Sequence, residues 1–293
     1  MDEPGFAWRD ATVAIVGLGL IGGSFALALR EKHVCRKIIA VDRDPETRAR
    51  AAATGIETAA ALDAIAPADL IVLATPARAI IELLPRVGAQ ARAGAIVFDL
   101  GSTKREIARA MRTLPAPVQC LGGHPMCGKE TAGFAAADAN LFRNAVFALT
   151  PLERTAPQTV ARIAALVETF GARPLVLDAE RHDHIVAAIS HLPYTVAAAL
   201  MLVAAERART DDLTFALAAS GFRDTSRLAA SNVAMMLDIL LTNREHIAAL
   251  MRAHAQAENH LADLLARGDE DALHATLERA AEQRRALFQN QKS

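Results

Sequence analysis

Residues 1–178 alternate short runs of β-branched residues with stretches of helical periodicity, and this alternation limits the possible folds more than any other feature of the chain. The runs that we expect to be strands are 12–17, 37–42, 69–75, 95–100, 118–123, 144–150 and 174–178. Strands separated by helices pair through right-handed crossovers, which place helices on both faces of a mostly parallel sheet. The sequence therefore predicts an α/β fold for this part of the chain.

Residues 179–293 contain no convincing strand, and stretches rich in Ala and Leu follow one another. Breaks between these stretches, several with Ser, Thr or Asp placed as helix N-caps, fall near 210–212, 220–222, 231–232, 242–243 and 267–271. We therefore expect two domains, residues 1–178 with the sheet and residues 179–293 all helical. The helical part is short and apolar for an isolated bundle, which favours packing against a second copy of the chain.

The composition argues against several classes of protein. Lys and Arg number 32 against 33 Asp and Glu, so no basic excess points to nucleic acid or to an anionic membrane. The cysteines, Cys35, Cys120 and Cys127, form no CxxC pair and are odd in number, which disfavours a disulfide framework and a zinc site. Residues 1–10 lack the apolar core of a signal peptide, and the longest apolar run, 194–205, is too short to span a bilayer. These features predict a soluble, cytoplasmic protein with neither a nucleic-acid nor a membrane partner.

The segment VGLGLIGGS, residues 16–24, has the spacing G-x-G-x-x-G at Gly17, Gly19 and Gly22, with Leu20 and Ile21 inside it. It follows the first expected strand and opens an expected helix, as this motif does in dinucleotide-binding domains. Gly17 allows the tight turn, Gly19 lets the backbone approach a pyrophosphate, and Gly22 permits close helix–strand packing. The helix N-terminus then offers free N–H groups to the phosphates. Glycines that merely turn a strand into a helix are the alternative, and in this full context we favour a Rossmann-like domain.

Residues after the next two strands bear on the choice of cofactor. Asp42 ends the second strand, where a carboxylate accepts hydrogen bonds from an adenosine ribose and repels a 2′-phosphate, so NAD is favoured over NADP. Arg43 directly afterwards can soften that preference, unless it is a solvated loop residue. Thr75 and Pro76 end the third strand, where the chain can pass over the nicotinamide half; an ordinary strand-to-helix turn is the alternative.

Four further stretches contain polar side chains that are candidates for a substrate site. Ser102 in FDLGSTK follows a strand end, where ligands bind in parallel sheets, although it can also serve as a helix N-cap. His124 lies in GGHPMCGKETAG, which we expect to be a loop after the next strand. The segments RHDHIVAAISHLPY and GFRDTSR add His182, His184, His191, Arg223, Asp224 and Arg227. The histidines lack Cys or Glu partners at ligand spacing, so we expect no metal.

Taken together, GLGLIGGS, DLGSTK, GGHPMCGKETAG, HDHIVAAISHLPY and GFRDTSRLAAS resemble, in sequence and order, the prephenate/arogenate (cyclohexadienyl) dehydrogenase family of tyrosine biosynthesis. The resemblance covers residues from about 12 to 232. It implies a Rossmann-like domain followed by a helical dimerisation domain, and a homodimer. It also implies oxidative decarboxylation of a cyclohexadienol, with hydride transfer from the ring alcohol carbon to NAD and loss of CO₂.

The resemblance assigns roles to single residues. His124 matches the family's catalytic base, as a neutral histidine near pH 7 should. Ser102 matches a serine that bonds the substrate hydroxyl or orients the histidine and the nicotinamide. Arg227 matches the arginine that holds a substrate carboxylate, for which a guanidinium provides a bidentate clamp. His182 and His191 match supporting histidines of the substrate site.

Two departures from the family's pattern concern substrate choice. The family's SHLPH is SHLPY here, so Tyr194 replaces a histidine that can bind the substrate side chain. Ser220 stands where the family often has glycine. Asp224 is expected to hold the Arg227 loop. Prephenate, arogenate or both remain possible substrates.

Two rival functions are weighed against this one. A β-hydroxyacid dehydrogenase on a similar fold needs a catalytic lysine in its helical domain, yet Lys292 is the only lysine in residues 179–293. A non-catalytic NAD-binding protein leaves His124 and Ser102 without a purpose.

Overall fold

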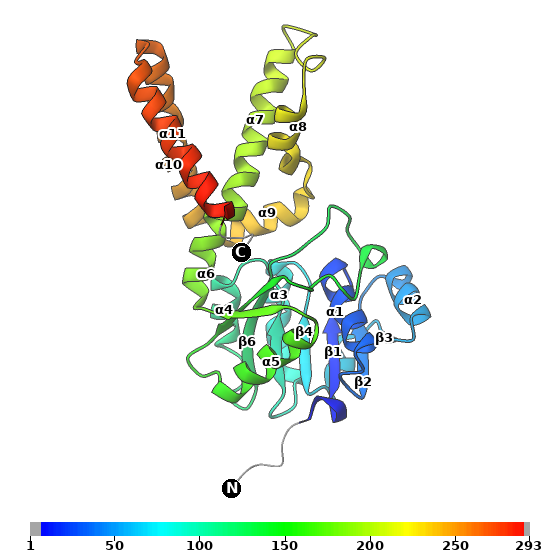
Figure 1. The fold of residues 1–293 in the computed structure, drawn as a ribbon. Coiled ribbons are helices and arrows are strands. Elements are labelled where there is room, and N and C mark those ends of the chain that lie inside the picture. The colour runs from blue at the N-terminus through cyan, green and yellow to red at the C-terminus, as the bar shows by residue number, and fades with distance from the viewer. Residues whose placement is uncertain (1–6, 290–293) are drawn as a thin grey trace. The chain divides into compact units, whose positions relative to one another are not determined.

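The computed structural model describes residues 7–289, and the N-terminal segment before Ala7 and Lys292 lie outside this range. The chain divides into two compact units, with the division after Arg244. The boundary that we expect near residue 178 separates the sheet from the helices that follow it. The division by contacts falls later, and helices Ala179–Val186 and Val233–Thr242 are hydrogen-bonded through Asp183 and Asp238 to the N-terminal ends of helices that cover the sheet. The first unit contains the sheet and the candidate site (Figure 1).

An eight-stranded sheet forms the centre of the first unit, in the order β3-β2-β1-β4-β5-β6-β7-β8. All neighbours are parallel except β6 and β7, so the prediction of a mostly parallel sheet is confirmed. The strands are β1 Thr12–Val16, β2 Lys37–Val41, β3 Glu57–Ala59, β4 Leu70–Leu73, β5 Ile96–Asp99, β6 Gln119–Pro125, β7 Val146–Pro151 and β8 Arg173–Val176. Each expected strand is present, and β3 is the one that the sequence did not predict.

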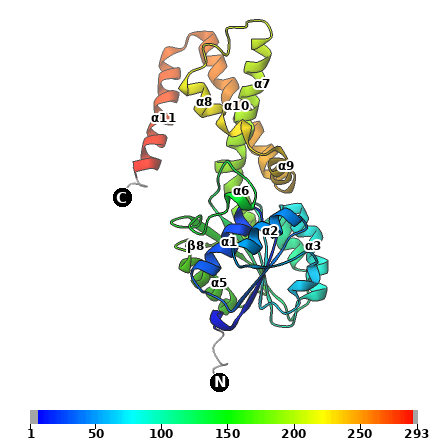
Figure 2. The same cartoon turned by 90° about the vertical axis from the view of Figure 1, so that its right-hand side faces the viewer.

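Helices cover both faces of the sheet (Figure 2). On one face α1 and α5 bury Phe25, Leu29 and Leu166, and on the other α3 and α4 bury Leu84 and Met111. The helices of this part are α1 Leu20–Glu31, α2 Pro45–Ala53, α3 Ala77–Gln90, α4 Arg105–Met111 and α5 Pro157–Thr169. Both apolar layers consist of buried aliphatic and aromatic residues, which is the burial expected for a sheet covered on both sides.

The segments after β8 are helical as far as Gln289, in agreement with the sequence. They are α6 Ala179–Val186, a π-helical turn Ala187–His191, α7 Leu192–Ala208, α8 Ser220–Ser226, α9 Val233–Thr242, α10 Arg244–Arg267 and α11 Glu270–Gln289. Most of α10 and all of α11 form the second unit, in which Gly268 (φ +63°) lies at the turn between the two helices. The helix starts follow the predicted breaks, and Asn232 caps α9 by accepting the Met235 N–H at 2.9 Å.

Residues 179–208 form one helical stretch that is long and apolar enough, by length and composition, to cross a membrane. The apolar run 194–205 is therefore only part of a longer helix than the sequence suggested. His191, near the middle of this stretch, is 1 % exposed and lies 3.3 Å from the Asn243 amide. The helical stretch is therefore buried inside the protein at His191.

Candidate active site

The glycine-rich turn lies where the strand order reverses between β1 and β4, which is the position of ligands in open α/β sheets. Gly17 has φ +93°, and a Cβ there would lie 2.7 Å from Cγ2 of Thr75 at the end of β4. A Cβ on Gly22 would lie 2.0 Å from the Gly17 carbonyl oxygen, so the helix can start this close to the strand only with glycine. A Cβ on Gly19 would have no neighbour within 4 Å, and the Thr75 hydroxyl oxygen is buried without a hydrogen-bond partner. An open surface beside an unused polar atom fits a bound dinucleotide.

Asp42 lies directly after β2, at the same edge of the sheet as the glycine-rich turn. Its carboxylate accepts the Leu18 N–H at 2.7 Å and the Asp44 N–H at 2.9 Å, which fixes the side chain beside the turn. Arg43 is exposed. The acidic group is therefore positioned where a ribose of a dinucleotide would lie.

His124 lies on β6 rather than in a loop, which corrects the sequence prediction that the strand ends at residue 123. The reason is the antiparallel partner β7, because His124 pairs with Ala148 and Pro125 with Phe147. A Cβ on Gly123 would meet the ring of Phe98 at 2.5 Å. This glycine therefore permits close packing of Phe98 beneath the strand.

A hydrogen-bonded series connects His124 to the first helix after the sheet. Nδ1 of His124 lies 2.9 Å from Nε2 of His182, and Nδ1 of His182 lies 2.8 Å from Oδ1 of Asp183. His182 is 2 % exposed and Asp183 is fully buried. Burial, together with His182, Lys104 and His191, holds the pKa of His124 well below its usual value of 6.5. His124 is therefore neutral near pH 7, as a general base must be.

The π-helical turn explains how His191 joins this group. His182 and His191 are nine residues apart, so regular α-helical spacing would place them on opposite sides of the helix. The π-helical turn accommodates an additional residue and so rotates His191 back toward Asp183. The Asn243 amide nitrogen contacts both, at 2.8 Å from the Asp183 carbonyl oxygen and 3.3 Å from Nδ1 of His191.

Ser102 is not a helix cap in this structure. Helix α4 begins at Arg105, and its first N–H groups, those of Lys104 and Arg105, are accepted by the Asp183 carboxylate at 2.7 and 2.8 Å. Within residues 7–289 the Ser102 hydroxyl has no hydrogen-bond partner, and it remains partly exposed. The serine is therefore available to a ligand at the carboxyl end of β5.

A buried ion pair lies beneath the strand that carries His124. The Lys104 ammonium contacts the Asp99 carboxylate and donates to the Gly123 carbonyl oxygen at 2.6 Å. Neither side chain of the pair is exposed, and burial raises the pKa of Asp99 and lowers the pKa of Lys104. The pair ties the ends of β5 and β6 together, one residue before His124.

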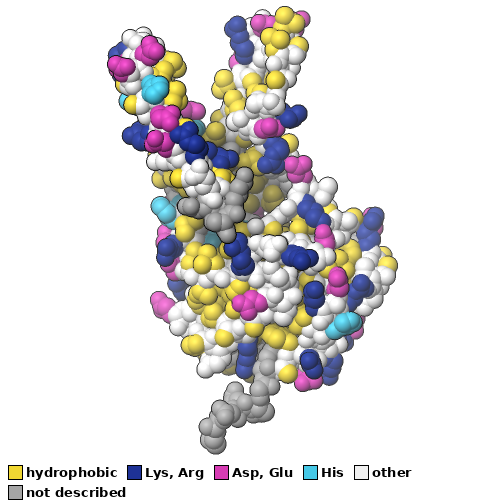
Figure 3. All heavy atoms as spheres, viewed as in Figure 1, with side chains coloured by type: hydrophobic (Ala, Val, Ile, Leu, Met, Phe, Trp, Pro, Cys, Tyr) yellow, Lys and Arg dark blue, Asp and Glu magenta, His cyan; other side chains and the backbone are white. Residues whose placement is uncertain are grey.

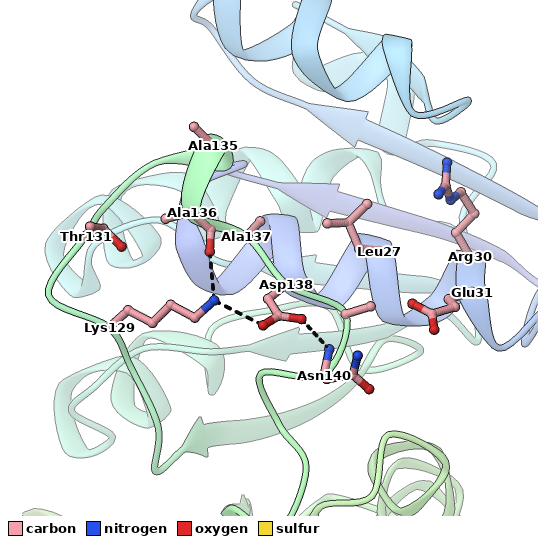
Figure 4. Close-up of a pocket in the computed structure, with 11 residues that line it drawn as sticks. Leu27, Arg30, Glu31, Lys129, Thr131, Ala135, Ala136, Ala137, Asp138 and Asn140 are labelled. Atoms are coloured by element: carbon pink, nitrogen blue, oxygen red, sulfur yellow. Dashed lines mark hydrogen bonds and ion pairs between the residues drawn. The ribbon is translucent and has the colours of Figure 1, made fainter.

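The chain that follows His124 is anchored to α1. The Asp138 N–H donates to Oγ of Ser24 at 2.9 Å, and Phe134 packs beside Gly23. Figure 4 shows the pocket between this segment and α1, where the Lys129 ammonium lies 3.1 Å from Oδ2 of Asp138. None of the site histidines lines this pocket. This pocket is therefore not the candidate active site.

Arg227 contacts the same segment through Glu130, with 3.0 Å between Nη1 and Oε1. Both side chains are exposed, so the guanidinium is accessible. Asp224, which we expected to hold the Arg227 loop, is paired instead with its neighbour Arg223 at 3.1 Å. Ser220 is exposed at the start of α8, and Tyr194 is partly exposed on α7.

Cys127 follows β6 and is half-buried. Burial raises the pKa of the Cys127 thiol to about 11, which agrees with an apolar packing role. Cys35, Cys120 and Cys127 are all free. Within residues 7–289 no group of His, Cys, Asp and Glu side chains has an arrangement that could hold a metal ion.

Sequence reasoning missed four buried polar residues of the site, which are Asp99, Lys104, Asp183 and Asn243. Asp99 and Lys104 lie in the same stretch as Ser102, and Asp183 follows His182, so these positions could have been noticed from the sequence. Asn243 lies 52 residues from His191 and has no local signal.

We expect the free energy of unfolding to fall as the pH drops below 6.5. Burial lowers the pKa of His191 from 6.5 to about 4, so the unfolded chain takes up a proton before the folded one. The stabilisation from the neutral residue is therefore present above pH 6.5 and is lost toward pH 4, with about 2 kcal/mol lost between pH 7 and pH 5. Urea unfolding at these two pH values, for the wild type and His191→Asn, measures it. An equal loss in the variant would assign the effect to other groups.

A mostly parallel sheet with a glycine-rich turn at its switch point is the architecture of a dinucleotide-binding domain, and here a histidine lies at the same edge of the sheet. Residues 25–176 match the family model described as prephenate dehydrogenase, nucleotide-binding domain. Residues 178–279 match prephenate dehydrogenase, dimerization domain. The chain belongs to the prephenate dehydrogenase family.

Individual relatives agree with this assignment. A prephenate dehydrogenase of Bacillus subtilis is 36% identical over 244 residues, which cover 80% of this chain and 65% of the relative. A crystal structure of prephenate dehydrogenase from A. aeolicus, in complex with hydroxyphenyl propionate and NAD⁺, has a TM-score of 0.88 at 29% identity and covers 94% of this chain and 98% of the other. Synechocystis arogenate dehydrogenase has a TM-score of 0.82 at 32% identity and covers 93% of this chain and 98% of the other. The chain thus spans 65% of the length of the Bacillus subtilis relative and nearly all of the two solved chains.

Proposed function

We propose that the protein catalyses the NAD-dependent oxidative decarboxylation of prephenate, arogenate or both, to 4-hydroxyphenylpyruvate or tyrosine. The observation that carries the proposal is the position of His124. This neutral histidine, supported by His182 and Asp183, lies at the same edge of the sheet as the glycine-rich turn. A base beside a dinucleotide is what the oxidation of an alcohol requires.

Residues of the turn would hold the cofactor. Gly19 and the N–H groups at the start of α1 would lie against the pyrophosphate, and Leu20 and Ile21 belong to the same turn of helix. Asp42 would bond the adenosine ribose and disfavour a 2′-phosphate, so we propose NAD as the preferred cofactor even with Arg43 nearby. Thr75 and Pro76 would face the nicotinamide half. Bound NAD supplies the hydride acceptor for the alcohol carbon.

His124 would take the proton of the ring hydroxyl as the alcohol carbon of the substrate is oxidised. Loss of CO₂ leaves the electrons of the broken C–C bond in the ring, and aromatisation places them on the same oxygen. His124 can then return the proton to that oxygen, so the substrate and product balance without net proton release. Ser102, with its free hydroxyl, is proposed to bond the substrate hydroxyl or to orient His124.

Arg227 is proposed to bind a substrate carboxylate, exchanging its contact with Glu130 for the substrate. We expect Arg227→Ala to raise KM for the substrate about 10- to 100-fold, because a charge-assisted pair contributes about 1.5–3 kcal/mol. Arg223→Ala, which removes an exposed arginine four residues away, is the matched control and should leave KM near wild type. Steady-state kinetics measure both, and a large loss of kcat at unchanged KM would contradict a clamp that acts in the ground state.

Tyr194, Ser220, Asp224 and His191 are proposed to line the substrate side of the site. Tyr194 offers a phenolic hydroxyl where the family's histidine stands, so we propose that it distinguishes the side chains of prephenate and arogenate by hydrogen bonding. The test is kcat/KM for both substrates, each with NAD and with NADP. We expect turnover of at least one substrate and a higher value with NAD, and absence of turnover with both substrates would refute the proposal.

We further propose a cytoplasmic homodimer with a sheet domain at residues 1–178 and a helical dimerisation domain at residues 179–293. Leu202 and Val203 on α7 are 73 % and 71 % exposed, and apolar side chains are visible on the α7 and α8 region (Figure 3). A second copy of the chain would cover these side chains. Sedimentation equilibrium should give twice the monomer mass, whereas a monomer at micromolar concentration would argue against the dimer.

A further inference from the structure

We propose that Asp183 and Asn243 are positioning residues that fix which ring nitrogen of each site histidine carries the proton. The inference deepens the proposed function, because it takes His124 as the base of that reaction. Asp183 lies inside the motif HDHIVAAISHLPY but has no role assigned above, and Asn243 lies outside the motifs.

Asp183 fixes the proton of His182. Both carboxylate oxygens already accept backbone N–H groups, from Lys104 at 2.7 Å and Arg105 at 2.8 Å. The group therefore acts as an acceptor toward Nδ1 of His182 as well, at 2.8 Å. A neutral imidazole has one N–H, so Nδ1 of His182 carries it and Nε2 becomes an acceptor.

His182 in turn fixes the proton of His124. Its Nε2 lies 2.9 Å from Nδ1 of His124, so His124 must donate from Nδ1. Nε2 of His124 then has a free lone pair. This nitrogen is the one that can take a hydroxyl proton.

Asn243 fixes the proton of His191 on Nε2, whereas His182 and His124 carry theirs on Nδ1. Its side chain is fully buried, and the amide nitrogen donates to the Asp183 carbonyl oxygen at 2.8 Å. Because a carbonyl oxygen only accepts, the orientation of the amide is determined. The same nitrogen lies 3.3 Å from Nδ1 of His191, so Nδ1 accepts and the His191 proton is on Nε2. The site thus combines a hydrogen-bond acceptor on His124 with a donor on His191.

A purely structural role is the competing explanation, since Asp183 also caps α4 and Asn243 joins α9 to the site. The two explanations differ in one observable. A structural role makes no demand on the tautomers of the histidines, whereas the proposal assigns each of them.

The test is long-range ¹H–¹⁵N correlation NMR of the histidine rings in the full chain near pH 7, with assignments from single histidine variants. We expect the Nδ1–H tautomer for His182 and His124 and the Nε2–H tautomer for His191. His124 as Nε2–H in the wild type would overturn the proposal.

Asp183→Asn extends the test, because an amide can donate to His182 as well as accept. We expect mixed tautomers at His124 and a kcat at least about tenfold lower, with KM for NAD unchanged. Asp178→Asn is the matched control, since Asp178 caps α6 by accepting the Arg181 N–H at 2.7 Å. A lower kcat with wild-type tautomers would show that Asp183 is structural. Turnover with the wrong His124 tautomer refutes this inference alone, whereas the expected tautomers without turnover refute the proposed function alone.

Discussion

Replacing His124 by Asn is expected to lower kcat about 10²–10⁴-fold, which is the range for loss of a general base. An asparagine side chain can accept a hydrogen bond from the substrate hydroxyl but cannot take its proton near neutral pH. The Kd for NAD should stay close to the wild-type value, because the glycine-rich turn does not contain His124. Steady-state kinetics and a fluorescence titration with NAD measure the two quantities.

His184→Asn is the control for this prediction. His184 is an exposed histidine on α6, two residues after His182, and we give it no catalytic role. It should turn over at the wild-type rate. A His124→Asn protein with undiminished kcat would exclude His124 as the base.

Replacing Gly22 by Ala is expected to displace the backbone of the nucleotide-binding turn. The new Cβ would lie 2.0 Å from the Gly17 carbonyl oxygen and 2.8 Å from Cβ of Ala74, and backbone must move to admit it. Overpacking of this kind costs about 1–3 kcal/mol or more, and a displaced turn should raise the Kd for NAD at least about tenfold. Urea unfolding and NAD titration measure the two effects.

Gly19→Ala separates the two effects. A Cβ at Gly19 has no protein neighbour within 4 Å, so the free energy of unfolding should be unchanged apart from a small propensity effect. NAD affinity should still fall, because the methyl group would occupy the space of the pyrophosphate. Wild-type NAD affinity in Gly19→Ala would place the dinucleotide elsewhere.

The sheet could be predicted from sequence because most of its strands are compact apolar runs separated by helices. β3 was missed since Glu57–Ala59 is three residues long and has no apolar run. The reversed direction of β7 relative to β6 was also beyond prediction, because strand direction depends on the path of the chain in space. That reversal is what extends β6 and places His124 on a strand.

The candidate site was predicted where residues adjoin a motif and missed where tertiary contacts create it. His124, Ser102 and the glycines stand in recognisable stretches. The π-helical turn leaves no mark in the hydrophobic pattern, so the proximity of His191 to Asp183 had no signal. Asn243 contacts both because α9 ends beside α6, which local sequence cannot reveal.

The measurement that tests the central claim most directly is the stoichiometry of the reaction. Purified protein is mixed with NAD and prephenate, and in parallel with arogenate, and reduced nicotinamide and CO₂ are measured together over time. We predict that with at least one substrate the two products form in equal molar amounts. Reduced nicotinamide without CO₂, or neither product with either substrate, would contradict the account.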